Sequence, residues 1–395
     1  MEHQATRFND IRGQIDPWLL IASLLLGAIG VVMVGSSSLA IGEIEKVGKA
    51  GYLIKQSIFL AVGVLGAIVM TRIELKELEK RAHLALLLSI ALLLLVWVPG
   101  LGVKVNGARR WINLGISNFQ VVEAVKLLFI IWMASFMKRF SEGLQASWKV
   151  LATPFAVTLF LVVLLMAQPD FGSSVLLFTI CGGMLVLGGG NVPRLMLPAV
   201  ALAIAAIGLV IFEPYRMRRV TSFLRPWDDP FGQGYQLVNA LMGIGRGEWV
   251  GVGLGGSIQK LNYLPEANTD FIASIIGEEL GFVGLSFVIL LYAFFVGRAF
   301  WYGVKCVEMR RHFAGYVAFG IGLWFAFQAF VSMGVNMGIL PTKGLTLPLI
   351  SYGGSSVVVS CAAVGVLLRV TYELDRAKRQ VARSREEGPL YAATA

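Results

Sequence analysis

The feature that most constrains this chain is a series of ten long apolar segments separated by short polar ones. They cover residues 17–40, 55–71, 82–98, 121–137, 149–167, 172–189, 194–213, 271–297, 313–339 and 346–369. A helix needs about 20 apolar residues to cross a bilayer. A lone strand would leave its backbone polar groups unpaired in lipid, so these segments must be helices. We therefore predict an all-α polytopic membrane protein with about ten transmembrane helices.

The composition agrees with a membrane protein. Of the 395 residues, 56% are hydrophobic and only 15% are charged, whereas about 25% are charged in a typical soluble domain. Much of the net charge of +10 falls between apolar segments and in the C-terminal tail, where topology and lipid headgroups account for it. No basic patch is interleaved with aromatic residues, so nucleic-acid binding is not expected.

The lysines and arginines of the short loops predict the orientation. The loop after the second apolar segment, with Arg72, Lys76, Lys80 and Arg81, lies on the same side as the N-terminus, and such basic loops are typically cytoplasmic. We expect a cytoplasmic N-terminal tail at 1–16 and a transmembrane domain at 17–370. A basic and mostly disordered cytoplasmic tail should follow at 371–395. The large external loop then spans 214–269, between the seventh and eighth helices.

A group of carboxylates stands where the chain re-enters the membrane from outside. The stretch YLPEANTDFIASIIGEELGFVG places Asp270 directly before an apolar segment and Glu266 four residues earlier. A carboxylate at membrane depth is costly unless water or a cation accompanies it, and two nearby like charges raise the pKa of one of them. Asp270 is either an interfacial acid solvated by the loop or a functional proton acceptor.

A second pair of charges lies near the external end of the fourth predicted helix. Glu123 and Lys126 are three residues apart and share one helix face. They could simply neutralise each other. Alternatively, Lys126 could face Asp270 across a water-filled cavity and hold that carboxylate ionised for proton transfer.

The external loop is rich in arginine. Its arginines are Arg216, Arg218, Arg219, Arg225 and Arg246. The planar guanidinium group can bind two phosphate oxygens at once, so an anionic partner is one interpretation and lipid phosphate is the other.

Gly251, Gly253 and Gly256 match a GxGxxG pattern. No strand–helix unit surrounds them, and tight turns with close packing are expected instead of dinucleotide binding.

Three further segments at external helix ends combine Gly or Pro with polar residues: NGARRW (106–111), QPDFGSS (168–174) and LPTKGLTLPLISYGGSS (340–356). Irregular backbone of this kind is tolerated at membrane depth where it lines a polar cavity. Together with the intramembrane charges, these segments predict a cavity open to the outside.

These motifs resemble those of the SEDS family, named for shape, elongation, division and sporulation, over nearly all of residues 15–372, and the division branch more than the elongation branch. The resemblance implies a peptidoglycan glycosyltransferase that polymerises lipid II on the outer face of the bacterial plasma membrane at the division septum, with undecaprenyl pyrophosphate as the leaving group. It implies that Asp270 is the general base and that Lys126, beside Glu123, is its partner.

The same resemblance gives the remaining expectations. The candidate substrate-binding residues are Arg109, Arg110, Arg216, Arg218, Arg219, Glu266, Thr269, Gln168, Asp170, Lys343, Ser351 and Tyr352. A divalent cation, Mg or Mn, would suit the pyrophosphate, although no carboxylate cage can be read from the sequence. The expected partners are a class B penicillin-binding protein acting as septal transpeptidase, other membrane proteins of the division machinery, and membrane lipids.

Two departures from the family pattern affect the site. Val121 and Val122 stand where the family has Pro and Ser, and Asn268 stands where it commonly has His. Two other functions stay open, a lipid II flippase and a non-enzymatic division scaffold. A transporter would favour a polar site near the middle of the membrane, whereas these polar motifs gather at the external rim.

Overall fold

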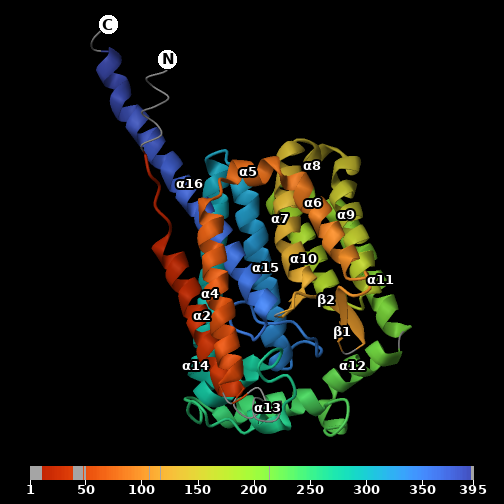
Figure 1. The fold of residues 1–395 in the computed structure, drawn as a ribbon. Helices are drawn as coiled ribbons and strands as arrows, with labels where there is room; N and C mark the ends of the chain where they lie inside the picture. Colours follow the sequence, from red (N-terminus) through yellow and green to blue (C-terminus); the bar gives the residue numbers. More distant parts are fainter. Residues whose placement is uncertain are drawn as a thin grey trace.

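The computed structural model describes residues 11–38, 48, 50–105, 107–115, 117–212 and 214–392. Long helices run alongside one another in one bundle, and shorter elements cap its two ends (Figure 1). The long helices are α2 (Pro17–Ser37), α4 (Gly51–Arg72), α6 (Ala82–Leu95), α7 (Val121–Arg139), α9 (Trp148–Ala167), α10 (Phe171–Leu187), α11 (Val192–Ile211), α14 (Ile272–Glu308), α15 (His312–Asn336) and α16 (Gly354–Ala392). Each predicted apolar segment overlaps one of them.

The apolar character of these helices fits a bilayer. Six described helices, α2, α4, α9, α14, α15 and α16, are long and apolar enough to cross a membrane, and α6 and α10 are shorter apolar helices. On α4, Ile58, Leu65 and Val69 are all more than half exposed. Water on so much apolar surface would be unfavourable, at about 25 cal/mol per Å², so lipid covers this face. The number of membrane crossings stays a prediction.

The 214–269 region, expected to be a loop, is largely helical. It contains α12 (Pro214–Leu224), the short helix η1 (Pro226–Asp228), α13 (Tyr235–Gly247) and the single turn η2 (Gln259–Tyr263). In Figure 1 these lie at the end of the bundle opposite α5 (Leu75–Lys80) and α8 (Gly143–Ala146). The expected external segment is therefore a folded cap.

A small sheet accompanies the predicted helices and was not expected from the sequence. Strands β1 (Gly102–Val105), β2 (Ala108–Asn113) and β3 (Asn118–Gln120) form an antiparallel sheet in the order β1-β2-β3. Trp111 of β2 pairs with Val103 on one side and with Gln120 on the other. The segment is too short and polar to span lipid, and its alternating apolar residues suit a hairpin at the membrane surface.

Both ends of the described chain meet at the same end of the bundle. The Asp16 amide donates to Thr371 Oγ1 (3.1 Å), and the Gln14 amide donates to Asp375 Oδ2 (2.8 Å). The expectation of a mostly disordered tail after residue 370 is wrong, because α16 continues to Ala392 and projects beyond the other helices (Figure 1). Much of the predicted 1–16 tail and residues 393–395 lie outside the described residues.

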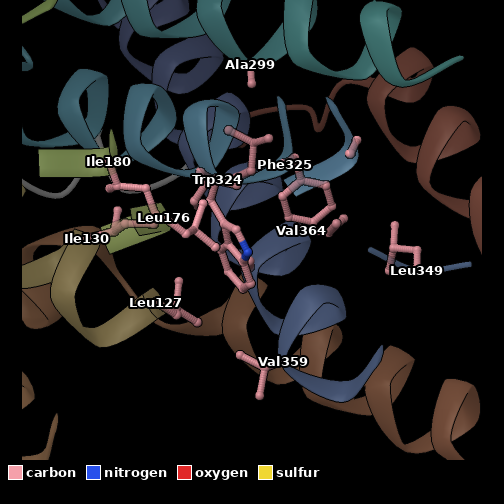
Figure 2. Packing of buried hydrophobic residues seen from close by; sticks show 14 of the residues in the cluster. Leu127, Ile130, Leu176, Ile180, Ala299, Trp324, Phe325, Leu349, Val359 and Val364 are labelled. Atoms are coloured by element: carbon pink, nitrogen blue, oxygen red, sulfur yellow. The ribbon is translucent and has the colours of Figure 1, made fainter. Parts of the chain in front are cut away.

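The core of the bundle centres on α15. Figure 2 shows Trp324 and Phe325 among side chains from several other helices, including Leu127, Ile130, Leu176, Ile180, Val359 and Val364. Trp324 and Phe325 are fully buried. Close packing of this kind fixes α7, α10 and α16 around α15, and these elements carry the polar groups described below.

Helix α14 is broken in its N-terminal third. Gly281 has φ +66°, a left-handed conformation that favours glycine. The break frees backbone groups that the segment before it satisfies: the Val252 amide donates to Glu278 O (3.0 Å), and the Phe282 amide donates to Glu248 O (2.8 Å). Gly251 packs against the Glu279 carbonyl so closely that a Cβ atom would not fit. The interpretation of the GxGxxG glycines as turn and packing residues is thus confirmed for Gly251.

Two ion pairs, each made by a buried glutamate, fix the same region. Arg246 Nη1 lies 2.7 Å from Glu278 Oε1, and Lys260 Nζ lies 2.7 Å from Glu279 Oε1. Ser36 Oγ of α2 also donates to Glu279 at 2.7 Å. These two glutamates therefore bind the 214–269 cap to the first turns of α14.

Candidate active site

Asp270 lies in the turn that leads into α14. Its backbone carbonyl accepts a hydrogen bond from Asn336 Nδ2 of α15 (2.8 Å). The oxygen of the same Asn336 amide accepts from Ser274 N (3.0 Å) and Ser274 Oγ (2.8 Å). A single buried side chain of α15 thus fixes both Asp270 and the first turn of α14.

The irregular segment between α15 and α16, here called the 340–353 loop, packs behind Asp270. Ser351 Oγ donates to Thr269 O (2.6 Å), and the Tyr352 amide donates to Asn268 O (2.8 Å). A Cβ atom built on Gly344 would lie 2.5 Å from Asp270 Oδ2. Only a glycine lets the loop backbone approach the carboxylate this closely. The sequence predicted irregular backbone over 340–356 and an apolar segment from about residue 346. In the structure α16 starts at Gly354, so the residues before it are irregular and the helix begins later than the apolar segment.

The surroundings of Asp270 favour its protonated form more than water does. Burial raises the pKa of the Asp270 carboxyl to about 7, and the negative charge of Glu266 shifts it in the same direction. Glu266 is held by Thr269, whose Oγ1 donates to Glu266 Oε2 (2.7 Å). A carboxylate with a pKa near neutrality is suited to accept a proton at physiological pH. Asp270, Glu266 and Thr269 thus share one turn.

Lys126 is paired with Glu123 in this structure, which is the simpler of the two sequence-based alternatives. Its Nζ lies 2.8 Å from both carboxylate oxygens of Glu123. The ammonium group also sits 4.7 Å from the centre of the Trp324 ring. Both side chains of the ion pair are almost completely buried, so the charges compensate each other in a dry environment.

The ion pair is connected to the loop behind Asp270. Lys126 Nζ donates to Gln328 Oε1 (2.8 Å), and Gln328 Nε2 donates to the Thr346 carbonyl (2.7 Å). Thr346 lies two residues after Gly344 in the 340–353 loop. The two charged groups that the sequence singled out are therefore connected to the same loop, Asp270 directly at Gly344 and Lys126 through Gln328.

The turn between α9 and α10 brings further candidate residues together. Asp170 caps α10, with Oδ2 accepting from Ser173 Oγ (2.7 Å), and it interacts electrostatically with Lys126. Gln168 is buried and its Nε2 donates to Leu93 O (2.9 Å). Arg110 of β2 donates to the Gln168 carbonyl (3.0 Å) and to the Pro169 carbonyl. Gln168 and Arg110 thus hold the sheet and the α9–α10 turn together.

Two other predicted residues lie beside these elements. Lys343 of the 340–353 loop places its Nζ 3.7 Å from the centre of the Phe171 ring, at the start of α10. Tyr352 packs edge-on against Tyr52 of α4, with ring centroids 4.9 Å apart. The loop therefore bridges α10 and α4 while it packs on Asp270.

The remaining arginines are dispersed. Arg109 is exposed on β2, and Arg218 is exposed on α12. Arg216 and Arg219 also lie on α12, but their side chains are outside the described part of the structure. Arg246 donates to Glu278 (2.7 Å) and to Gly256 O (3.3 Å), so it stabilises the cap.

The side chains around Asp270 do not form a metal-binding site by themselves. Within the described residues, no group of three or more His, Cys, Asp and Glu side chains could hold a metal ion. The turn of Asp270 supplies one further carboxylate, Glu266, which already accepts from Thr269. A Mg²⁺ ion here would depend on water and substrate phosphate oxygens for most of its ligands.

Sequence reasoning missed the polar residues of α15. Gln328, Ser332 and Asn336 follow one another at four-residue intervals and are all buried. This spacing places them on one face of an otherwise apolar helix. A buried polar stripe of this kind marks polar partners on a neighbouring element, and it could have been read from the sequence.

The chain matches a family of cell cycle proteins. The model of the FtsW, RodA and SpoVE family, described as "Cell cycle protein", matches residues 17–376. The chain is 60% identical over 379 residues to the probable peptidoglycan glycosyltransferase FtsW of Xanthomonas oryzae pv. oryzae, covering 96% of this chain and 77% of that protein. It is 46% identical over 370 residues to the protein of the same name from Halorhodospira halophila, covering 93% of each.

Solved structures share the fold. A chain from a study of structural coordination of polymerization and crosslinking by a peptidoglycan synthase complex has a TM-score of 0.75 and 30% identity, covering 91% of this chain and 98% of that one. The rod shape determining protein RodA of Thermus thermophilus has a TM-score of 0.66 and 28% identity, covering 90% and 96%. The bundle described here is therefore an arrangement that other solved proteins also adopt.

Proposed function

Because this chain belongs to the FtsW, RodA and SpoVE family of cell cycle proteins, we propose that it is a peptidoglycan glycosyltransferase with Asp270 as its general base. The relatives named above are described as enzymes of this activity at up to 60% identity. The observation that supports the base assignment is the pKa of Asp270, raised by burial to about 7. Such a group exchanges protons readily near neutral pH.

The reaction joins two lipid II molecules. The 4-hydroxyl oxygen of the acceptor sugar attacks the anomeric carbon of the donor, and the bond from that carbon to undecaprenyl pyrophosphate breaks with its electron pair. The hydroxyl proton passes to Asp270. Pyrophosphate leaves as an anion and needs charge stabilisation more than a proton. One carboxylate base therefore suffices, unlike the two carboxylates of glycoside hydrolysis.

The Glu123–Lys126 pair has no net charge, but it would hold an ammonium group in a fixed position at the site. Lys126 is held by Glu123 and Gln328, and Asp170 lies within its electrostatic reach. A preorganised cation of this kind costs no reorganisation as negative charge develops during the reaction. The single positive charge of Lys126 is therefore proposed to favour the departing anion or the ionised base.

The pyrophosphate contacts are also proposals. Arg109 and Arg218 are exposed cations, and together with Arg110, Arg216 and Arg219 they are candidates for the diphosphate oxygens. Lys343, Ser351, Tyr352, Glu266, Thr269, Gln168 and Asp170 are candidates for the rest of the substrate. A divalent cation stays a prediction from the family resemblance.

The protein is a multi-pass membrane protein, and its finer placement is proposed. We assign the active site to the extracytoplasmic face of the inner membrane at the septum, with both chain ends in the cytoplasm. A solved structure with the same fold comes from a peptidoglycan synthase complex that couples polymerization and crosslinking. This likeness supports a penicillin-binding protein as partner, and we propose the class B septal transpeptidase.

The activity can be tested with purified protein and its cognate transpeptidase. Labelled lipid II in detergent micelles should be converted to glycan strands that migrate as a ladder on gels. When the same protein is reconstituted in proteoliposomes, it should not transfer lipid II from one leaflet to the other. Leaflet transfer without polymer would identify a flippase. Neither activity, in protein that still binds the transpeptidase, would identify a scaffold.

A further inference from the structure

Gln328 connects two parts of the candidate site that are distant in the sequence. Its side chain belongs to α15 and is only 1% exposed. The Oε1 atom accepts from Lys126 Nζ (2.8 Å) and from Trp324 Nε1 (2.6 Å). The Nε2 atom donates to the Thr346 carbonyl (2.7 Å) and lies 3.3 Å from Thr346 Oγ1. Both ends of the amide are therefore occupied.

The orientation of this amide follows from the chemistry of its neighbours. The ammonium of Lys126 and the indole N–H of Trp324 are donors only, so the amide oxygen must face them. Its NH₂ group must then face Thr346, whose carbonyl is an acceptor only. A glutamate would still accept from the two donors, but its second oxygen would oppose the Thr346 carbonyl. A methionine of similar length would make none of these hydrogen bonds.

Thr346 belongs to the loop that packs behind the candidate base. Gly344, two residues earlier, lies against Asp270 Oδ2. Ser351 Oγ accepts from the Leu347 amide (2.7 Å) and donates to Thr269 O (2.6 Å), next to Asp270. Thr346 Oγ1 also lies 3.1 Å from Ser356 Oγ at the start of α16. The hydrogen bond from Gln328 therefore fixes the middle of the loop, between its contacts with Asp270 and Thr269.

We propose that Gln328 is a positioning residue, which holds the 340–353 loop against Asp270 with its NH₂ group while its oxygen fixes the Lys126 ammonium. Gln328 itself needs no contact with the substrate, because it acts through the loop and the lysine. The kinetic consequence rests on the proposed function, whereas the effect on the surroundings of Asp270 does not.

The test compares Gln328→Glu and Gln328→Met with Ser332→Ala in the full-length protein. Ser332 is the matched control, because it is buried one turn away on α15 and its hydroxyl has no hydrogen bond among the described residues. Both variants lose the hydrogen bond to the Thr346 carbonyl, which leaves a buried acceptor without its donor, and this loss should lower kcat by about 10- to 100-fold. The KM for lipid II should stay within about threefold of wild type. Ser332→Ala should change neither value.

A second readout does not depend on turnover. A carbodiimide modifies protonated carboxyl groups, and mass spectrometry of the labelled peptide gives the pH at which half of Asp270 reacts. We expect this midpoint near 7 in wild type. In both Gln328 variants, water admitted by the loosened loop should lower it by about one pH unit or more.

The outcomes separate the two proposals. A wild-type midpoint in both Gln328 variants overturns the positioning role, whether or not kcat falls, and so does an equal shift in Ser332→Ala. Wild-type kcat in both variants overturns it as well. If the wild-type protein makes no glycan but the midpoint shifts in both variants, the proposed function fails and the positioning of Asp270 by Gln328 stands.

Discussion

Lys126 and Glu123 form a buried ion pair in which the ammonium lies 2.8 Å from each carboxylate oxygen. Removing one partner should leave the other charge uncompensated. Lys126→Met should therefore lower the free energy of unfolding by about 3–5 kcal/mol and strongly impair polymerisation. In the double variant Lys126→Met/Glu123→Gln, stability should largely recover while polymerisation stays low. Thermal unfolding in detergent and glycan synthesis measure the two effects. Wild-type polymerisation by the double variant would show that the reaction needs no cation there.

The contact between Gly344 and Asp270 gives a second prediction. A methyl group at residue 344 would lie 2.5 Å from Asp270 Oδ2, so Gly344→Ala must displace either the loop or the carboxylate. A misplacement of this size should lower kcat by about 10- to 100-fold. Gly297→Ala on α14 is the matched control, because no neighbouring atom lies within 4 Å of the added carbon. Equal rates for the two variants would mean that Asp270 does not depend on this loop.

The activity should depend on pH through Asp270. Burial and the Glu266 charge raise its pKa to about 7, and only the deprotonated form accepts a proton. The rate at saturating lipid II should therefore rise as the pH passes through about 7 and level off above it. Glu266→Gln removes the like charge, so the midpoint should move to lower pH. A rate profile whose midpoint is the same in wild type and Glu266→Gln would exclude the assigned electrostatic coupling.

The catalytic rate should rise with pH, whereas the contribution of Asp270 to the stability of the fold should fall with pH. The folded-state pKa of Asp270, about 7, exceeds the ordinary value of about 3.9 for an unfolded chain. Between these two values the folded state binds more protons, so the contribution of Asp270 to stability falls as the pH rises. Asp270→Asn should therefore be more stable than wild type above about pH 7, and the difference should vanish near pH 4. Thermal unfolding across this range measures it. A difference that does not change with pH would contradict the raised pKa.

The helices of the bundle could be predicted well because each one is marked by a continuous run of apolar residues. Each of the ten apolar segments overlaps a long helix. In lipid, a single segment can satisfy all its backbone hydrogen bonds only by forming a helix. The prediction failed where the chain leaves the apolar environment. The β1–β3 sheet, the helices of the 214–269 cap and the continuation of α16 to Ala392 lie in polar or mixed sequence, where no single periodicity dominates.

The site could be predicted in part. Unusual charges beside apolar segments pointed to Asp270, Glu123 and Lys126. Their pairing could not be read from the sequence, because Glu123 and Asp270 were both plausible partners of Lys126 and only the packing of α7 against α15 distinguishes them. Gln328 and Asn336 carry no charge, so they drew no attention in the sequence, although their contacts fix Lys126 and the backbone of Asp270.

Glycan synthesis by Asp270→Asn tests the base assignment most directly. The amide keeps the size of the carboxylate but cannot take a proton from the attacking hydroxyl. Its matched control is Asp228→Asn, an exposed carboxylate of the 214–269 cap. With purified lipid II and the cognate transpeptidase, we expect glycan strands from Asp228→Asn at the wild-type rate and essentially none from folded Asp270→Asn. Strand synthesis by Asp270→Asn at the wild-type rate would contradict it.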